Sequence, residues 1–215
     1  MSYKLVVFDF DGTLADSFPF FLEVFDTLAD IHGFKRLDRS RLDQLRRCDA
    51  RELIRHVDMP LWKMPRVAMH FKALMADNIG RIALFDGAGE MLQRLAERGT
   101  QLAILSSNSE ENVRAVLGPE HASLIHHYVC GVSLFGKHRK LRRLLADSGF
   151  ARHEVLCVGD EIRDIEAARA ERLAFGAVGW GYTRIEALRA HAPELVFASV
   201  DEIAEQVAGR HTGQN

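Results

Sequence analysis

Two carboxylates separated by one residue stand out as the groups in this sequence best suited to chemistry. Asp9 and Asp11 end a nearly continuous apolar run and precede Gly12, which permits a sharp turn close to a ligand. Alternate side chains of a strand point to the same side, so both carboxylates would face one site. They would repel each other there unless a cation neutralised them or one held a proton. The pair therefore suits a metal site or a nucleophile with an acid/base partner. The competing interpretation is a strand followed by a common Asp-Gly turn.

A second acidic pair follows another apolar run. Asp160 follows the run 155–158 after one residue, Gly159, and Asp164 lies one helical turn later, so both side chains can point toward one site. A helix cap with acidic residues favoured by the helix dipole would account for this pair alone. That alternative loses force because two acidic pairs then end strands of the same predicted sheet.

Hydroxyl, amide and ammonium groups lie between the two acidic pairs. Ser106, Ser107 and Asn108 follow the apolar run 102–105 and precede a predicted helix. A hydroxyl and backbone amides at a helix N-terminus form a ready phosphate site, although a plain Ser/Asn cap explains the same residues. Lys137 precedes a further predicted helix and could neutralise phosphate and aspartate; alone it would be read as an exposed lysine.

The elements that must position these groups alternate between short apolar strands and amphipathic helices. The predicted strands are residues 4–8, 102–105, 155–158 and 174–178, with weaker ones at 128–130 and 195–197. Nearly continuous apolar runs are typical of parallel strands that are covered on both faces. The pattern predicts an α/β fold, with a Rossmann-like parallel sheet and helices on both of its faces.

One long stretch, residues 16–82, shows helical patterning and no convincing strand. We expect an all-helical cap domain there, inserted after the first strand, and a discontinuous catalytic core made of residues 1–15 and 83–210. Residues 211–215 are expected to be a disordered tail. Such a cap would sit over the carboxyl edge of the sheet, where open parallel sheets bind ligands.

In the order acidic pair, hydroxyl, lysine, acidic pair, the chain resembles the haloacid dehalogenase superfamily, and within it the phosphoglycolate phosphatase-like branch with a helical cap. The likeness runs from Lys4 to about Val207. The segments that carry it are Asp9-Phe10-Asp11-Gly12-Thr13-Leu14-Ala15-Asp16-Ser17, Ser106, Lys137, Gly159-Asp160-Glu161-Ile162-Arg163-Asp164 and the loop Gly179-Trp180-Gly181-Tyr182.

The resemblance implies a magnesium-dependent phosphatase that acts on a small phosphorylated metabolite, with phosphoglycolate as a candidate. Asp9 would be the nucleophile that forms an aspartyl phosphate, and Asp11 the general acid and base. The implied metal residues are Asp9, Asp11 through its backbone carbonyl, Asp160, and Asp164 through a water. The implied phosphate-binding residues are Ser106, Ser107, Asn108, Lys137 and Gly12.

Some positions depart from the family pattern or leave alternatives open. Glu161 adds a negative charge beside the predicted metal site. Arg46 and Arg47 lie where relatives have a substrate-contacting loop, so either could meet an anionic group of the substrate or simply face solvent. A phosphomutase resembling β-phosphoglucomutase and a non-catalytic phosphate- or metal-binding module are the alternatives. A dehalogenase is disfavoured because it does not need the acid at Asp11.

Composition narrows the choice of partners. The formal net charge of the 215 residues is -2, which gives no general attraction to nucleic acid or to an anionic membrane. No apolar run approaches the roughly 20 residues needed to span a bilayer. We expect a cytoplasmic enzyme, and the sequence leaves the choice between monomer and homodimer open.

Overall fold

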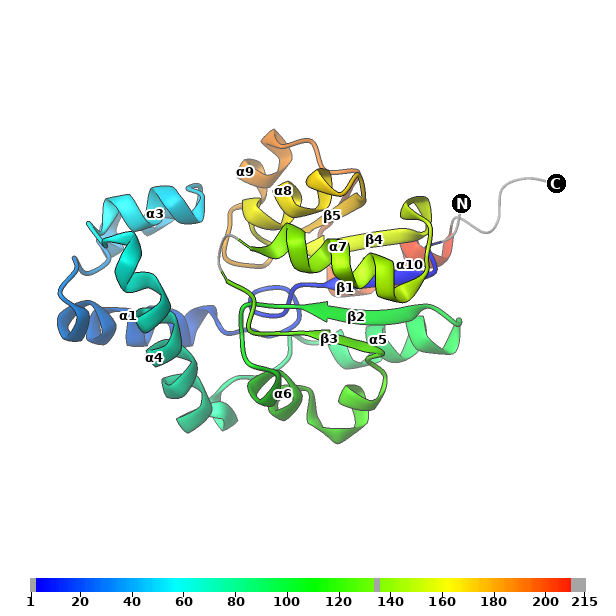
Figure 1. Cartoon of the computed structure of the whole chain (residues 1–215), viewed down its shortest axis with the longest axis horizontal. Helices are drawn as coiled ribbons and strands as arrows, with labels where there is room; N and C mark the ends of the chain where they lie inside the picture. The colour runs from blue at the N-terminus through cyan, green and yellow to red at the C-terminus, as the bar shows by residue number, and fades with distance from the viewer. Residues whose placement is uncertain (1–2, 134–135, 210–215) are drawn as a thin grey trace.

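The computed structural model describes residues 3–133 and 136–209 and contains a six-stranded parallel sheet (Figure 1). The strands are β1 (Leu5–Phe8), β2 (Gln101–Leu105), β3 (His127–Val129), β4 (Val155–Gly159), β5 (Ala174–Val178) and β6 (Leu195–Phe197). Their order in the sheet is β3-β2-β1-β4-β5-β6, which places β1 between β2 and β4. The predicted strands and the α/β class are confirmed. The expected disordered tail, residues 211–215, lies outside the described residues.

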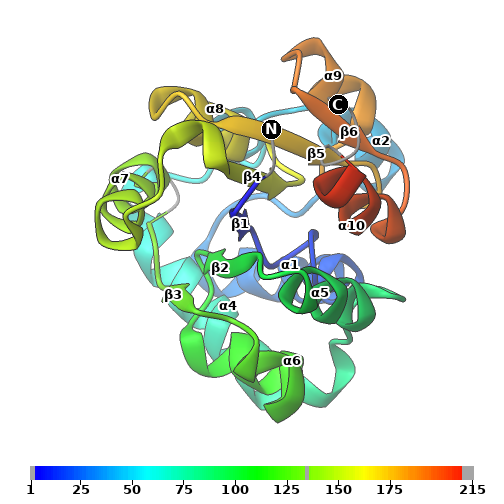
Figure 2. The same ribbon diagram turned by 90° about the vertical axis from the view of Figure 1, so that its right-hand side faces the viewer.

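Helices cover both faces of the sheet (Figure 2). One face carries α5 (Ala88–Glu97), α6 (Glu110–Ser123) and α10 (Val200–Gly209), and the other carries α7 (Lys137–Ser148), α8 (Ile162–Ala170) and α9 (Ile185–Ala190). The alternation within β1 shows why both faces need a cover. Val6 and Phe8 pack with α5, α6 and α10, whereas Leu5 and Val7 pack with α7, α8 and α9. Since both faces are apolar, ligand chemistry is confined to the strand ends.

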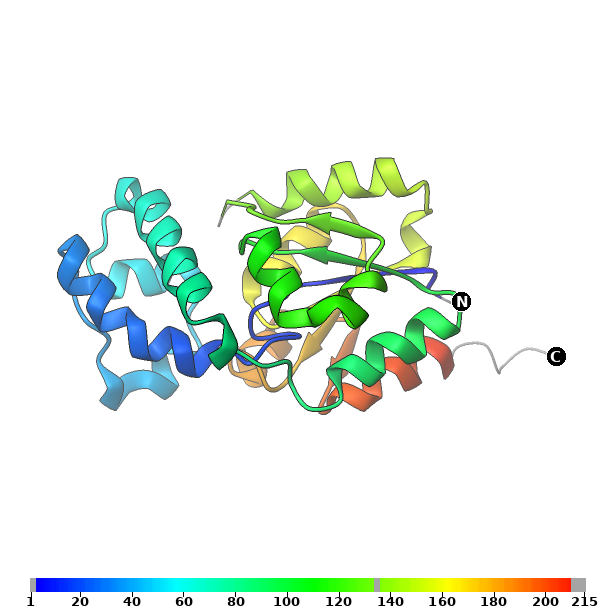
Figure 3. The same ribbon diagram turned by 90° about the horizontal axis from the view of Figure 1, so that it is seen from below.

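Residues 16–82, which we call the helical insert, contain helices and no strand. The elements are α1 (Phe18–His32), η1 (Arg39–Arg41), α2 (Leu42–Leu45), α3 (Ala50–His56), η2 (Leu61–Lys63), α4 (Met64–Asp77) and η3 (Ile79–Arg81). The insert has an apolar cluster of its own around Phe25, Leu37, Leu45 and Val57. It stands beyond the carboxyl ends of the strands (Figure 3).

Two short stretches of chain join the insert to the sheet and pair with each other. The N–H of Asp16 donates to the carbonyl of Ala83 at 2.9 Å, and the N–H of Phe85 donates to the carbonyl of Leu14 at 2.9 Å. Ala15 and Leu84 form an antiparallel bridge between them. The entry and exit of the insert are therefore tied together beside the motif that contains Asp9 and Asp11.

No helix within the described residues is long and apolar enough to cross a membrane.

Candidate functional site

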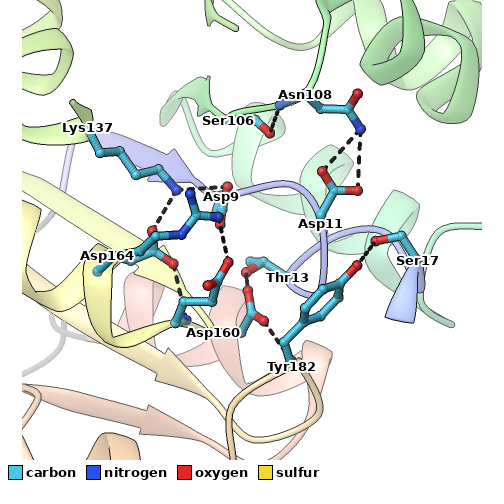
Figure 4. Close-up of polar contacts among 12 residues, drawn as sticks. Asp9, Asp11, Thr13, Ser17, Ser106, Asn108, Lys137, Asp160, Asp164 and Tyr182 are labelled. Carbon is cyan, nitrogen blue, oxygen red and sulfur yellow. Dashed lines mark hydrogen bonds and ion pairs between the residues drawn. The ribbon is translucent and has the colours of Figure 1, made fainter. Parts of the chain in front are cut away.

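Three buried carboxylates from two neighbouring strand ends converge at the carboxyl edge of the sheet (Figure 4). Asp9 follows β1, and its N–H donates to the carbonyl of Val158 in β4 at 2.8 Å. Asp160 follows β4, and Asp164 lies in the first turn of α8. Oxygen atoms of these three carboxylates lie within 4.8 Å of one another, although the side chains are almost wholly buried. The adjacency of β1 and β4 is what brings Asp9 together with Asp160 and Asp164.

Lys137, the first residue of α7, is buried between two of these carboxylates. Its Nζ lies 2.8 Å from Asp9 Oδ1 and 2.6 Å from Asp164 Oδ1. Burial on its own raises the pKa of Asp9, but the charges of Lys137 and Arg163 outweigh it and hold that pKa below its usual value. Asp9 is therefore ionised, as a nucleophilic carboxylate must be.

The other two carboxylates of the cluster are destabilised as anions. Burial, followed by the negative charges of Glu161 and Asp9, raises the pKa of Asp160 well above its usual range. Burial and the charge of Asp9 raise the pKa of Asp164 to about 7. Asp160 accepts hydrogen bonds from Thr13 Oγ1 at 2.8 Å and from the backbone N–H of Tyr182 at 2.7 Å. These donors orient the carboxylate but do not neutralise the crowded negative charge.

A divalent cation fits this cluster. Asp9 Oδ2 is buried and has no hydrogen-bond partner among the described residues. An unpaired buried carboxylate oxygen is costly, and clustered oxygen ligands are what magnesium prefers. The chemistry of these residues therefore fits the magnesium ion that the sequence suggested.

Glycines make room for this cluster. A Cβ added at Gly12 would overlap the Asp160 carboxylate, and one added at Gly181 would overlap the side chain of Asp160. Gly12 also has φ +76, a left-handed backbone that disfavours other residues. Gly12 and Gly181 thus allow two loops to close around Asp160.

Asp11 points away from the cluster of Asp9, Asp160 and Asp164 and is held by the side-chain amide of Asn108 (Figure 4). Asn108 Nδ2 donates to its two carboxylate oxygens at 3.1 and 3.4 Å. Burial and the charge of Asp9 raise the pKa of Asp11 to about 6. A carboxyl group with this pKa can both donate and accept a proton near neutral pH, which suits general acid/base work.

The three residues after β2 that are expected to bind phosphate lie at the same carboxyl edge of the sheet, but their side chains make different contacts. Ser106 is buried, and its Oγ accepts the backbone N–H of Asn108 at 3.0 Å. Ser107 lines a cavity that also reaches Asp11. The Asn108 amide is engaged by Asp11, so its side chain orients the acid/base candidate in this structure.

The structure separates the two arginines of the insert. Arg46 lines the cavity, but its Nε donates to the carbonyl of Tyr182 at 2.9 Å and its Nη2 to that of Gly181 at 2.5 Å. Arg47 Nη2 lies 3.6 Å from Asp43 Oδ2, and both side chains are more than half exposed. Arg46 therefore ties the insert to the core loop, and Arg47 faces solvent away from the cavity.

Three residues at the site had no role in the sequence-based expectations. Thr13 and Tyr182 orient Asp160, and the charge of Arg163 helps to lower the pKa of Asp9. Arg163 Nη2 pairs with Glu161 Oε1 at 2.5 Å, whereas its buried Nε has no partner among the described residues. All three residues lie inside the segments that carry the family resemblance, which was the only sequence signal for a role at the site. The directions of their side chains and backbone groups become visible only in the folded chain.

Comparisons with known proteins agree with this geometry. The family model of haloacid dehalogenase-like hydrolases matches residues 6–178. A phosphoglycolate phosphatase of Synechococcus elongatus is 32% identical over 205 residues, which cover 95% of this chain and 97% of that protein. A phosphoglycolate phosphatase of Mesorhizobium japonicum is 28% identical over 234 residues, covering 98% and 97%. A solved haloacid dehalogenase-like hydrolase from Streptococcus pneumoniae shares the fold, with a TM-score of 0.77 at 17% identity and coverage of 95% and 98%.

Proposed function

We propose that this chain, which belongs to the haloacid dehalogenase-like hydrolase family and is a phosphatase, hydrolyses a small phosphate monoester through a phosphoryl group carried on Asp9, with Mg²⁺ as cofactor. The observation that carries the proposal is the convergence of Asp9, Asp160 and Asp164 around Lys137, with one Asp9 oxygen unpaired. Charge neutralisation and positioning supply most of the catalysis in phosphoryl transfer, and this cluster provides both.

In the first step, the Asp9 carboxylate attacks phosphorus and the bond from phosphorus to the ester oxygen breaks. Lys137 holds Asp9 Oδ1 at 2.8 Å, which orients the nucleophile and keeps it ionised. Protonated Asp11 gives its proton to the departing alkoxide, so the products of this step are an alcohol and an acyl phosphate on Asp9.

In the second step, water attacks the phosphorus of the acyl phosphate. Asp11, now ionised, takes a proton from this water, and the Asp9 carboxylate leaves as inorganic phosphate is formed. Ser106 and Lys137 would bind the phosphoryl oxygens throughout. The Asn108 amide, 3.1 Å from Asp11, keeps the acid/base group aimed at the same position in both steps.

The magnesium ion would be held by the carboxylates of Asp9 and Asp160, by the backbone carbonyl of Asp11, and by Asp164 through a water. Bound Mg²⁺ supplies neutralisation of the phosphoryl charge and of the crowded carboxylates. Thr13 and Tyr182 fix the Asp160 carboxylate for this purpose, at 2.8 and 2.7 Å.

The helical insert is proposed as the cap that covers the reacting groups, with its border at residues 15–16 and 82–83. The paired stretches 14–16 and 83–85 support this division, because their backbone hydrogen bonds tie the entry of the insert to its exit at the border with the core. Phosphoglycolate, the substrate in the names of the two relatives above, is the first metabolite to test. We further propose that the enzyme acts in the cytoplasm on a free metabolite.

Release of phosphate from p-nitrophenyl phosphate, followed by a screen of phosphorylated metabolites, tests the activity. We expect turnover with Mg²⁺ and none after chelation. A phosphomutase would instead return the phosphoryl group to a sugar, so conversion of a sugar 1-phosphate into a 6-phosphate without phosphate release would contradict the hydrolytic proposal.

Magnesium should stabilise the fold more strongly as the pH rises. Because the folded-state pKa values of Asp160 and Asp164 lie above their usual values, these groups favour the metal-free folded state at low pH. For Asp164 that contribution is lost as the pH rises from about 4 through about 7, and for Asp160 it is lost as the pH rises through its raised pKa. Mg²⁺ binds only the ionised carboxylates.

Thermal melts with and without Mg²⁺ at about pH 5.5 and about pH 8 check this expectation. At a free concentration of about 100 times the Kd, the stabilisation should reach about 2.7 kcal/mol. At the higher pH and without metal, Asp160→Asn should have a higher melting temperature than the native chain. Its melting temperature should not change when Mg²⁺ is added. An equal shift at both pH values, or a full shift in Asp160→Asn, would contradict this metal site.

A further inference from the structure

A cavity of about 240 Å³ lies between the helical insert and the strand ends. On the core side it is bordered by Asp11, Ser107 and Tyr182, so it reaches the proposed acid/base residue and the loop expected to bind phosphate. Helices α1 to α4 of the insert supply most of its wall. The side chains of the insert that line it are mainly apolar and include Phe18, Phe21, Phe71, Leu45, Val67 and Met59.

The cations on this wall already have partners. Arg46 and Arg163 are the two basic residues among the described residues that line the cavity. The Arg46 guanidinium donates to two backbone carbonyls and lies 4.7 Å from the centre of the Phe18 ring. Arg163 lies on the core side and pairs with Glu161 through Nη2 at 2.5 Å, and its buried Nε has no partner among the described residues. An acidic group of a substrate that entered the apolar part of the cavity would lose its water there without gaining a free cation.

An apolar group would instead fill space that the insert leaves empty. The apolar side chains that line this open cavity stay in contact with water in the free protein, and covering them with an apolar group is favourable. Phe21 and Phe71 are only partly buried in the insert although their rings pack together, with centroids 6.0 Å apart in an edge-to-face arrangement. A ligand body in contact with these rings would complete their burial.

We propose that the preferred substrates are phosphate monoesters of uncharged, apolar alcohols, with the phosphate at Asp9 and the hydrocarbon body in this cavity. The inference rests on the proposed phosphatase function and names its substrate class. The cavity discriminates by burying the alcohol part, so specificity rises with the apolar surface of that part and not with a second anionic group.

A series of n-alkyl phosphates from ethyl to hexyl tests the proposal with the native chain and Mg²⁺. The alcohols of this series are nearly equal as leaving groups, so differences in kcat/KM report binding of the chain and not chemical reactivity. We expect kcat/KM to rise by up to about fourfold per added methylene, and by at least about tenfold over the series. We also expect hexyl phosphate to exceed 2-phosphoglycolate.

Two alanines of α4 provide a matched pair of variants. Ala68 lines the cavity, whereas Ala73 is exposed on the same helix. Ala68→Phe should fill the cavity and lower the ratio of kcat/KM for hexyl over ethyl phosphate by about tenfold, roughly the binding of two methylenes. Ala73→Phe should leave this ratio unchanged.

The possible failures are distinguishable. If ethyl phosphate is hydrolysed in an Asp9-dependent reaction but kcat/KM is flat along the series, or if 2-phosphoglycolate exceeds hexyl phosphate, the substrate class is overturned and the phosphatase proposal stands. If no member of the series and no phosphoglycolate is hydrolysed in an Asp9-dependent way, both proposals fall.

Discussion

Asp9→Asn will reduce phosphatase turnover by about 10⁴-fold or more, because the amide can neither attack phosphorus nor leave as a carboxylate. The structure gives this residue a position that no neighbour can replace. Asp9 is the carboxylate that the charges of Lys137 and Arg163 keep ionised, whereas burial and nearby negative charge favour the protonated form of Asp160. Phosphate release from an alkyl phosphate and from p-nitrophenyl phosphate measures the loss.

The control for this variant lies in the same motif. Asp16 is exposed and does not belong to the carboxylate cluster. Asp16→Asn should therefore keep turnover within about threefold of the native chain, as surface substitutions usually change little. Turnover of Asp9→Asn within about a hundredfold of the native rate would show that another group is the nucleophile.

Asp11→Asn will slow turnover by about a hundredfold or more, while binding of magnesium is retained. Its carboxyl group is held by Asn108 at 3.1 Å and lies outside the three-carboxylate cluster, and only its backbone carbonyl is proposed as a metal ligand. Removing the proton donor should matter most where the leaving group needs a proton. The loss should accordingly be larger for an alkyl phosphate than for p-nitrophenyl phosphate, whose leaving group is stable as an anion.

Two measurements check this variant together. The ratio of kcat values, native over variant, is compared for the two substrates, and the Mg²⁺-dependent rise in melting temperature is compared for the two proteins. An equal loss for both substrates would rule out proton donation to the leaving group. Loss of the Mg²⁺-dependent shift would mean that the side chain of Asp11 is itself needed for the metal.

Much of the fold follows from local sequence pattern. The apolar runs at 4–8, 102–105, 155–158 and 174–178 correspond to β1, β2, β4 and β5 within one or two residues. Runs of this kind are readable because a parallel strand that is buried on both faces has almost no polar side chains. Likewise, the resemblance to the haloacid dehalogenase superfamily is confirmed by the family model that matches residues 6–178.

The spatial relations within the site could not be read in this way. Asp9 and Asp160 are brought together by the pairing of β1 with β4, which are separated by nearly 150 residues of chain and by two other strands. Likewise, Tyr182 orients Asp160 through its backbone N–H, a contact that is independent of its side chain. Such contacts depend on strand order and loop closure, for which the local pattern carries no information.

The arginines of the insert show the same limit. Arg46 and Arg47 are adjacent in a basic stretch, and the sequence does not distinguish them. The end of α2 directs Arg46 toward the carbonyls of Gly181 and Tyr182, whereas Arg47 is left beside Asp43 at the surface. The apolar cavity was equally invisible, since its wall is assembled from four helices whose packing leaves a space.

Mass spectrometry of the enzyme after rapid acid quenching during turnover tests the central claim most directly. Digestion with pepsin at low pH keeps an acyl phosphate intact and releases a peptide that contains Asp9. We predict that this peptide carries one additional phosphoryl group, that fragmentation places it on Asp9, and that it disappears when substrate is exhausted. A phosphoryl group on any other residue, or none at any quench time while turnover proceeds, would contradict the account.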